Sequence, residues 1–146
     1  ILYFGSGDFS TCIDYIQRII NDSSELRTDL QCYARLVHLL AHYELGNVDL
    51  MDYLTRSVYR YMSKMKNLTV IEQEMFRFFR NSFRFSRRQL TPEIETLLSK
   101  IKHLEGNRFE TRALAYLDII SWLESKVQGK TMSEVIYNKY LKSKRK

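Results

Sequence analysis

The sequence is poor in the two residues that make turns, with one proline and five glycines in 146 residues. β-Sandwiches and β-barrels join many short strands through turns rich in glycine and proline, so this composition disfavours an all-β fold. No apolar run approaches the roughly 18 residues that a membrane-spanning helix needs. We therefore expect an all-α fold with no membrane partner.

Cysteine is also scarce. The two cysteines, Cys12 and Cys32, lie in apolar surroundings, and the N-terminal residues have neither the basic start nor the cleavage site of a secretory signal. We expect buried free thiols and a cytoplasmic location. The length of 146 residues predicts a single domain over 1–146. Because the chain does not start with methionine, we expect it to be the C-terminal part of a longer protein.

The net charge of +6 comes from two stretches that contain no acidic residue. Residues 77–88 hold five arginines, and residues 139–146 hold five basic residues: Lys139, Lys142, Lys144, Arg145 and Lys146. Without these ten, 13 of the 23 basic side chains remain against 17 acidic ones. The excess positive charge is therefore concentrated in two patches rather than spread over the whole surface.

Apolar residues recur with the spacing of one helix face along nearly the whole chain. This pattern predicts seven helices, at about 9–20, 25–45, 48–66, 69–86, 92–104, 108–127 and from 132 onward. The segment 25–45 is apolar on two sides, which is typical of a helix placed between two neighbours. The connections are short, so consecutive helices are expected to be antiparallel neighbours.

Several helix ends carry their own signals. Asp8 is a candidate N-cap, and Thr69 with Glu72 and Thr131 with Glu134 match the capping box. Gly46 and Gly129 are expected just after helix C-termini. The pair Thr91-Pro92 predicts the start of the fifth helix, with proline at the first helical position.

An internal repeat of nearly 40 residues relates the first and third predicted helices. Gly7-Asp8-Phe9 and Gly46-Asn47-Val48 lie 39 residues apart, and the related strings Asp14-Tyr15-Ile16-Gln17-Arg18 and Asp52-Tyr53-Leu54-Thr55-Arg56 lie 38 apart. A period of this size is typical of stacked helix pairs.

These residues resemble the tetratricopeptide-repeat-like (TPR-like) superfamily. Gly7-Asp8-Phe9 with Cys12-Ile13 is similar to the start of the second helix of a repeat, and Ala41-His42-Tyr43-Glu44-Leu45-Gly46 is similar to the stretch before it. Residues 112–126 resemble the C-terminal part of uncharacterised bacterial proteins of this type. The resemblance implies a right-handed stack of about three helical hairpins plus a final helix, with more repeats upstream.

The resemblance also implies a function. Such proteins are non-enzymatic interaction modules, scaffolds or adaptors, that bind a protein or peptide through a concave groove. Here the groove would be lined by the helices at 25–45, 69–86 and 107–127.

The candidate partner-binding residues are the arginines of the fourth predicted helix and its end: Arg77, Arg80, Arg84, Arg87 and Arg88. On one helix they would occupy an arc of about 100°. Guanidinium groups bind carboxylates and phosphates, so an acidic protein partner is expected. Two alternatives remain open: nucleic-acid binding through this arginine stripe and the basic C-terminal tail, or neutralisation by Glu93, Glu95 or Glu105.

Catalytic and metal motifs are weak. His38 and His42 have the i, i+4 spacing of a two-histidine metal site, but the glutamate that follows the first histidine in zinc proteases is missing, and no third ligand is evident. Gly129-Lys130-Thr131 lacks the earlier glycine of a phosphate-binding loop. We therefore expect no enzyme activity, no metal and no cofactor.

Overall fold

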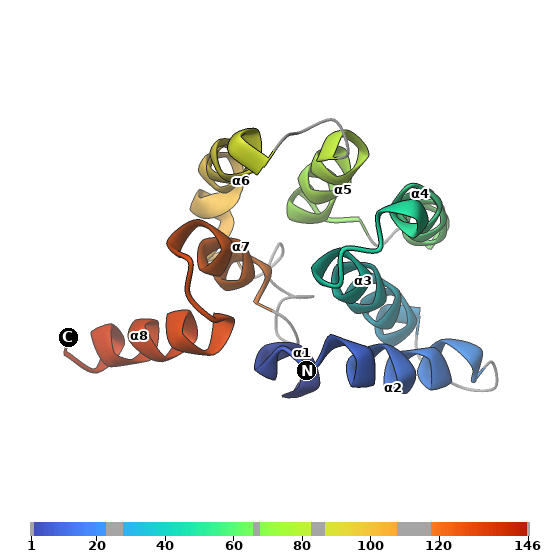
Figure 1. Ribbon diagram of the computed structural model, residues 1–146, viewed down its shortest axis with the longest axis horizontal. Helices are drawn as coiled ribbons and strands as arrows, with labels where there is room; N and C mark the ends of the chain where they lie inside the picture. Colours follow the sequence, from blue (N-terminus) through green and yellow to red (C-terminus); the bar gives the residue numbers. More distant parts are fainter. Residues whose placement is uncertain (1, 23–27, 66–67, 83–86, 108–117, 146) are drawn as a thin grey trace.

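The computed structural model describes residues 2–22, 28–65, 68–82, 87–107 and 118–145 (Figure 1). Throughout this part the protein is all-α, with no strand. The elements in chain order are α1 (Leu2–Ser6), α2 (Phe9–Asn21), α3 (Thr28–Glu44), α4 (Val48–Lys64), α5 (Val70–Ser82), α6 (Arg87–Ile101), the 3₁₀ turn η1 (Lys102–Leu104), α7 (Ile119–Gln128) and α8 (Met132–Lys144). The all-α class predicted from the sequence is confirmed. No helix in the described ranges has both the length and the apolar character to cross a bilayer.

The predicted capping signals form as expected. The Asp8 carboxylate accepts the backbone N–H of Thr11 at 3.2 Å. In both capping boxes the threonine and the glutamate exchange hydrogen bonds with each other's backbone N–H, at 3.2 Å before α5 and at 2.9 and 3.1 Å before α8. Gly46 and Gly129 have φ values of +72° and +64°, the left-handed conformation that glycine adopts most easily after a helix.

The predicted start of the fifth helix at Thr91-Pro92 is wrong. α6 begins at Arg87, and Pro92 lies inside it. Proline has no N–H to offer the carbonyl of Arg88, four residues earlier. Arg88, Gln89 and Thr91 of this first part are exposed, so water can satisfy that carbonyl and the helix can extend past the proline.

The sixth predicted helix is not continuous across Asp118. The Asp118 carboxylate accepts the backbone N–H of Ser121 at 3.0 Å and the Ser121 hydroxyl at 2.5 Å, so α7 begins only at Ile119. The earlier part of that helix, residues 108–117, lies outside the described residues. Aspartate is a strong N-cap, and at this position its side chain outweighs the apolar periodicity that continues through it.

Consecutive helices pack on one another along the stack, from α1 on α2 to α7 on α8. The stack curves so far that its two ends meet, because α8 also packs on α1 and the Ser133 hydroxyl donates to the Gly5 carbonyl at 3.0 Å. α3 lies between neighbours and is buried on two sides, as its sequence predicts (Figure 1). Cys12 and Cys32 are buried free thiols, also as predicted, and burial raises the pKa of Cys12.

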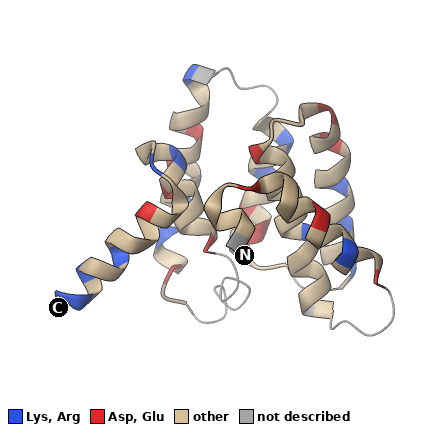
Figure 2. Ribbon diagram, turned by 60° about the horizontal axis from the view of Figure 1, so that its bottom comes forward, with Lys and Arg blue, Asp and Glu red and all other residues tan. Residues whose placement is uncertain are grey.

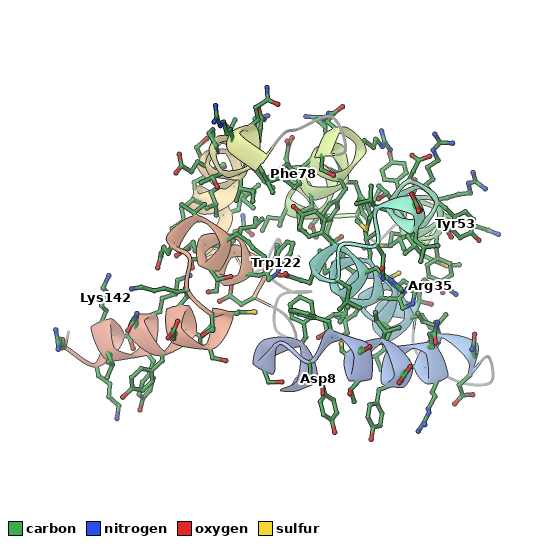
Figure 3. The ribbon with its side chains drawn as sticks, viewed as in Figure 1. Asp8, Arg35, Tyr53, Phe78, Trp122 and Lys142 are labelled. Carbon is green, nitrogen blue, oxygen red and sulfur yellow. The ribbon has the colours of Figure 1, made fainter. Side chains whose placement is uncertain are left out.

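Aromatic side chains fill the inner side of this arc. Tyr43 of α3 contacts Phe79 of α5 and Trp122 of α7, with ring centroids 5.2 and 5.8 Å apart, and Phe4 lies 6.4 Å from Trp122. Figure 3 shows Trp122 in the middle of the molecule. Its indole N–H donates to Glu44 at 2.5 Å, and Lys126 binds the same carboxylate. Around Trp122, the inner side of the stack is therefore filled by the protein's own core side chains. The family resemblance predicts a groove on this side.

Candidate binding surface

The five candidate arginines do not lie on one helix, so the predicted single arc is wrong. α5 ends at Ser82, while Arg87 and Arg88 belong to the start of α6, and Arg84 lies outside the described residues. The amide of Asn81 and the hydroxyl of Ser82 donate to carbonyls one turn earlier, at 3.2 and 2.9 Å. Such local hydrogen bonds compete with continuation of a helix.

Arg77 is turned toward α6 and is paired with a carboxylate of its own helix. Its guanidinium contacts Glu74 at 2.9 Å, and Lys100 of α6 approaches the same carboxylate at 3.9 Å. Glu74 is only 18% exposed but Arg77 is 65% exposed, so the pair neutralises the arginine in part. The expectation that an internal carboxylate neutralises part of the stripe is met here by Glu74 rather than by the three glutamates considered from the sequence.

Arg80 is turned the other way, toward α4. Its guanidinium carbon lies 4.6 Å from the centre of the Tyr59 ring. Tyr59 in turn packs edge-to-face on Phe76 at 5.5 Å. A guanidinium held over an aromatic face is stabilised and loses part of its side-chain freedom, so Arg80 is positioned before any partner arrives.

A depression of about 570 Å³ lies between α4 and α5 at this place. We call it the α4–α5 cationic depression; its lining residues are Arg56, Tyr59, Arg60, Ser63, Lys64 and Arg80. Four of these six side chains are cationic and none is acidic. Arg56 pairs with Asp52 at 3.2 Å, but both side chains are more than 60% exposed, so that pair neutralises the charge weakly.

Sequence reasoning identified only Arg80 of this depression. Arg56, Arg60 and Lys64 stand at i, i+4 and i+8, which places them in one row along α4 with about 6 Å between neighbours. The row was missed because Asp49 and Asp52 precede it closely, so this stretch is not free of acid. The four-residue spacing of the cations was the signal that could have found it.

The second basic stretch is used differently. Lys139 and Lys102 alternate with Glu105 and Glu124 in a closed ring of ion pairs that ties η1 and α7 to α8. The four contacts are 3.2 Å (Lys102–Glu105), 2.5 Å (Lys102–Glu124), 2.8 Å (Lys139–Glu105) and 3.1 Å (Lys139–Glu124). We call this the α7–α8 ion ring.

The ion ring shifts the pKa values of its members. Burial by itself would raise the pKa of Glu105, but hydrogen bonds from Lys139 and Lys102 outweigh it, so the pKa is lowered. Burial likewise opposes the charged form of both lysines, yet their bonds to Glu124 and Glu105 raise the pKa of Lys102 and of Lys139. The ring therefore holds charged groups in place rather than offering them to a ligand.

Lys130, Lys142 and Arg145 line a depression of about 380 Å³ between α7 and α8, whose lining also includes Glu124 and Lys139 of the ion ring. Figure 2 shows the basic residues of α8 beside the C-terminus, at one end of the molecule, while α4 lies at the opposite end (Figure 1). The two basic regions therefore do not form one continuous surface.

The histidine pair serves the fold. The His38 and His42 rings meet edge-to-face at 4.6 Å, and the Asn47 amide donates to Nδ1 of His42 at 2.9 Å, which ties the end of α3 to the start of α4. Burial lowers the pKa of His38 to about 4, helped by His42 and Arg35, and burial also lowers the pKa of His42. Within the described ranges no three His, Cys, Asp or Glu side chains are placed to hold a metal ion.

The structure establishes the fold class of this chain but not its family. Its all-α architecture is established by the structure, and the TPR-like relationship remains a prediction from the sequence. No family model, no curated protein and no solved structure matches this chain.

Proposed function

We propose that this protein is a non-enzymatic interaction module that binds an acidic segment of a partner protein at the α4–α5 cationic depression. The observation that carries the proposal is the convergence of Arg60 and Lys64 of α4 with Arg80 of α5 around one hollow without a lining carboxylate. This site lies between neighbouring helices and not in the concave groove that the family resemblance implies.

The spacing of the cations suits a peptide. Residues four apart in a helical peptide lie about 6 Å apart along the axis, which equals the spacing of Arg56, Arg60 and Lys64 along α4. Alternate residues of an extended peptide lie about 6.6–6.8 Å apart and fit nearly as well. A peptide with glutamates at either spacing can therefore place successive carboxylates against successive cations, with Arg80 binding from the α5 side.

The aromatic residue of the depression favours carboxylates over nucleic acid. Proteins that bind single strands stack bases on open aromatic faces. The Tyr59 ring has Arg80 over one face, and its packing partner Phe76 is buried beneath the helices. The separation of the two basic regions also removes the long cationic track that the nucleic-acid alternative would use.

We also propose that the stack is TPR-like and that it works in the cytoplasm. The support for the first is that α2 and α4, the two copies of the sequence repeat, each follow a glycine with positive φ, Gly7 at +87° and Gly46 at +72°. The support for the second is the pair of buried free thiols, which suits a reducing compartment.

The test is fluorescence anisotropy with a labelled 15-residue peptide that carries glutamate at every fourth position. Arg60→Glu/Arg80→Glu is expected to raise the Kd at least about tenfold, because two converging cations become repulsive. The matched control is Arg77→Glu/Arg88→Glu, which changes the net charge equally outside the depression and is expected to alter the Kd less than about threefold.

Two results would overturn the proposal. Equal weakening by both double variants would mean that the peptide responds only to overall charge. Tighter binding of a 15-nucleotide single-stranded DNA than of the peptide at the same salt concentration would favour the nucleic-acid alternative, and a steep fall of that affinity with salt would identify phosphate contacts.

A further inference from the structure

The outer face of α4 changes its chemistry along the helix. The second half carries the row of three cations that lines the α4–α5 cationic depression. The first two turns instead expose apolar side chains, with Val48 58%, Leu50 46% and Tyr53 69% exposed. The exposed face of this one helix is therefore apolar toward its start and cationic toward its end.

Tyr53 differs from the other two tyrosines of α4 in having no aromatic or cationic partner. Arg80 lies over the ring of Tyr59, and Arg35 lies over the ring of Tyr61, with its guanidinium carbon 4.0 Å from the ring centre. Tyr53 has no such contact in the part of the chain that the structure describes, and it is the most exposed large apolar side chain there. Figure 3 shows Tyr53 at the outer edge of the molecule, where another molecule can reach it.

The core of the protein does not use this face, because α4 already packs on both of its neighbours. It contacts α3 on one side and α5 on the other. Its buried face consists of Met51, Thr55, Val58 and Met62. A helix added to either end of the stack would pack on the end helices and not on α4, so another helix of the same stack would not cover the exposed face.

Leu50 and Tyr53 continue the row of cations toward the start of α4. Leu50 lies one turn before Tyr53, and we call these two residues the α4 apolar pair. Tyr53 lies seven residues before Arg60, which is about two turns or 10.5 Å, and the two side chains leave the helix within about 20° of the same direction. Val48 leaves the helix about 140° away from Tyr53 and does not belong to this row.

Two aspartates beside the α4 apolar pair set the register of a bound acidic segment. Asp49 lies in the first turn of α4, where a negative charge stabilises the helix, and Asp52 pairs with Arg56 at 3.2 Å. Both would repel a carboxylate placed over the first half of α4. An acidic partner therefore places its carboxylates over the second half, and the part of it that lies over the α4 apolar pair must be uncharged.

We propose that the partner segment is amphipathic, with glutamates that bind at the α4–α5 cationic depression and apolar residues, one turn beyond them, that pack on the α4 apolar pair. This inference rests on the proposed function and adds an apolar anchor to it. Exposed tyrosine and leucine side chains gain affinity from burial, and salt does not screen that gain. The charges fix the register, because only one placement puts both halves of the segment on matching surface.

Peptide extension tests the anchor by fluorescence anisotropy. The 15-residue acidic peptide is lengthened by one turn at either end, since a segment can run along α4 in two directions, and each extension carries two leucines or, for reference, two serines. The leucine peptide of one direction is expected to have a Kd at least about fivefold lower than its serine counterpart. The ratio of the two Kd values should stay within about twofold between about 0.1 and 0.5 M salt.

Two double variants locate the gain from the leucines. Leu50→Ser/Tyr53→Ser should remove most of it and leave the Kd of the serine peptide within about twofold. The matched control is Ile136→Ser/Tyr137→Ser, which removes an aliphatic and a tyrosine side chain of similar exposure, 42% and 59%, from α8 and should keep the gain.

The outcomes separate this inference from the proposed function. No gain from leucines in either direction would overturn the inference and leave the α4 apolar pair to another partner, and equal loss of the gain in both double variants would overturn it as well. In either case the proposed function stands if the serine peptides still bind and Arg60→Glu/Arg80→Glu weakens them. If no peptide binds, both fail.

Discussion

The two basic stretches of the sequence have opposite roles in the structure. Lys139 of α8 belongs to the α7–α8 ion ring, and its partners Glu105 and Glu124 come from other elements of the fold. Arg80 of α5 has an aromatic partner and contributes to a hollow whose lining has no acid. A basic stretch without acidic residues in the sequence is therefore not always an uncompensated positive surface, because folding can place carboxylates from distant residues beside it.

The comparison is sharpest for charge reversal at the ion ring. Lys139→Glu would place three carboxylates together, with Glu124 only 14% exposed, and we expect a loss of about 2–3 kcal/mol in the free energy of unfolding. Urea denaturation measures it. The control on the same helix, Lys142→Glu, should cost less than about 0.5 kcal/mol. Similar losses in the two variants would show that the ring does not hold α8 in place.

A smaller difference is expected between two arginines of the α4–α5 cationic depression. Arg80→Ala removes the contact with Tyr59 and should reduce the free energy of unfolding by about 0.5–1 kcal/mol. Arg60→Ala removes an exposed side chain on the outer side of α4 and should leave it within about 0.5 kcal/mol. If thermal unfolding shows the two variants to be equal, Arg80 is not held in advance of binding.

The smallest effect concerns pH. Because the pKa of Glu105 is lowered by folding from its ordinary value of 4.5, its contribution to stability is present above that value and is lost as the pH falls through the folded pKa. Glu105→Gln should therefore flatten the dependence of unfolding free energy on pH as the pH falls below about 4.5. An unchanged slope would mean that other carboxylates dominate acid unfolding. The raised pKa values of Lys102 and Lys139 act at the opposite end, where their contribution is lost above about pH 10.5.

Helix starts marked by a side chain that bonds its own backbone were predictable from the sequence. Thr69 with Glu72 and Thr131 with Glu134 form their capping boxes with the residues expected, because both partners lie within one turn. The failures came where two local signals compete. At Pro92 the helix starts earlier than the proline suggests, and at Asp118 an N-cap interrupts an apolar periodicity.

The binding surface was less predictable than the helices. Arg77 and Arg80 are three residues apart on α5, yet one turns toward Glu74 and α6 and the other toward Tyr59 and α4. Glu74 and Tyr59 are both present in the sequence, but the sequence does not show which of them each arginine contacts. The four-residue spacing of the cations on α4 could be seen in the sequence. The row became a candidate site only because the fold places it beside Arg80.

The sequence by itself determined the all-α class, the buried cysteines and the capped helix starts, because helical periodicity and capping depend on residues within a turn of one another. Only the tertiary structure decided that the inner side of the stack is filled by Tyr43, Phe79 and Trp122, and that Lys139 is enclosed by carboxylates while Arg80 is not. The first outcome depends on the curvature of the stack, which brings side chains of α3, α5 and α7 together, and the second depends on which neighbouring element each cation faces.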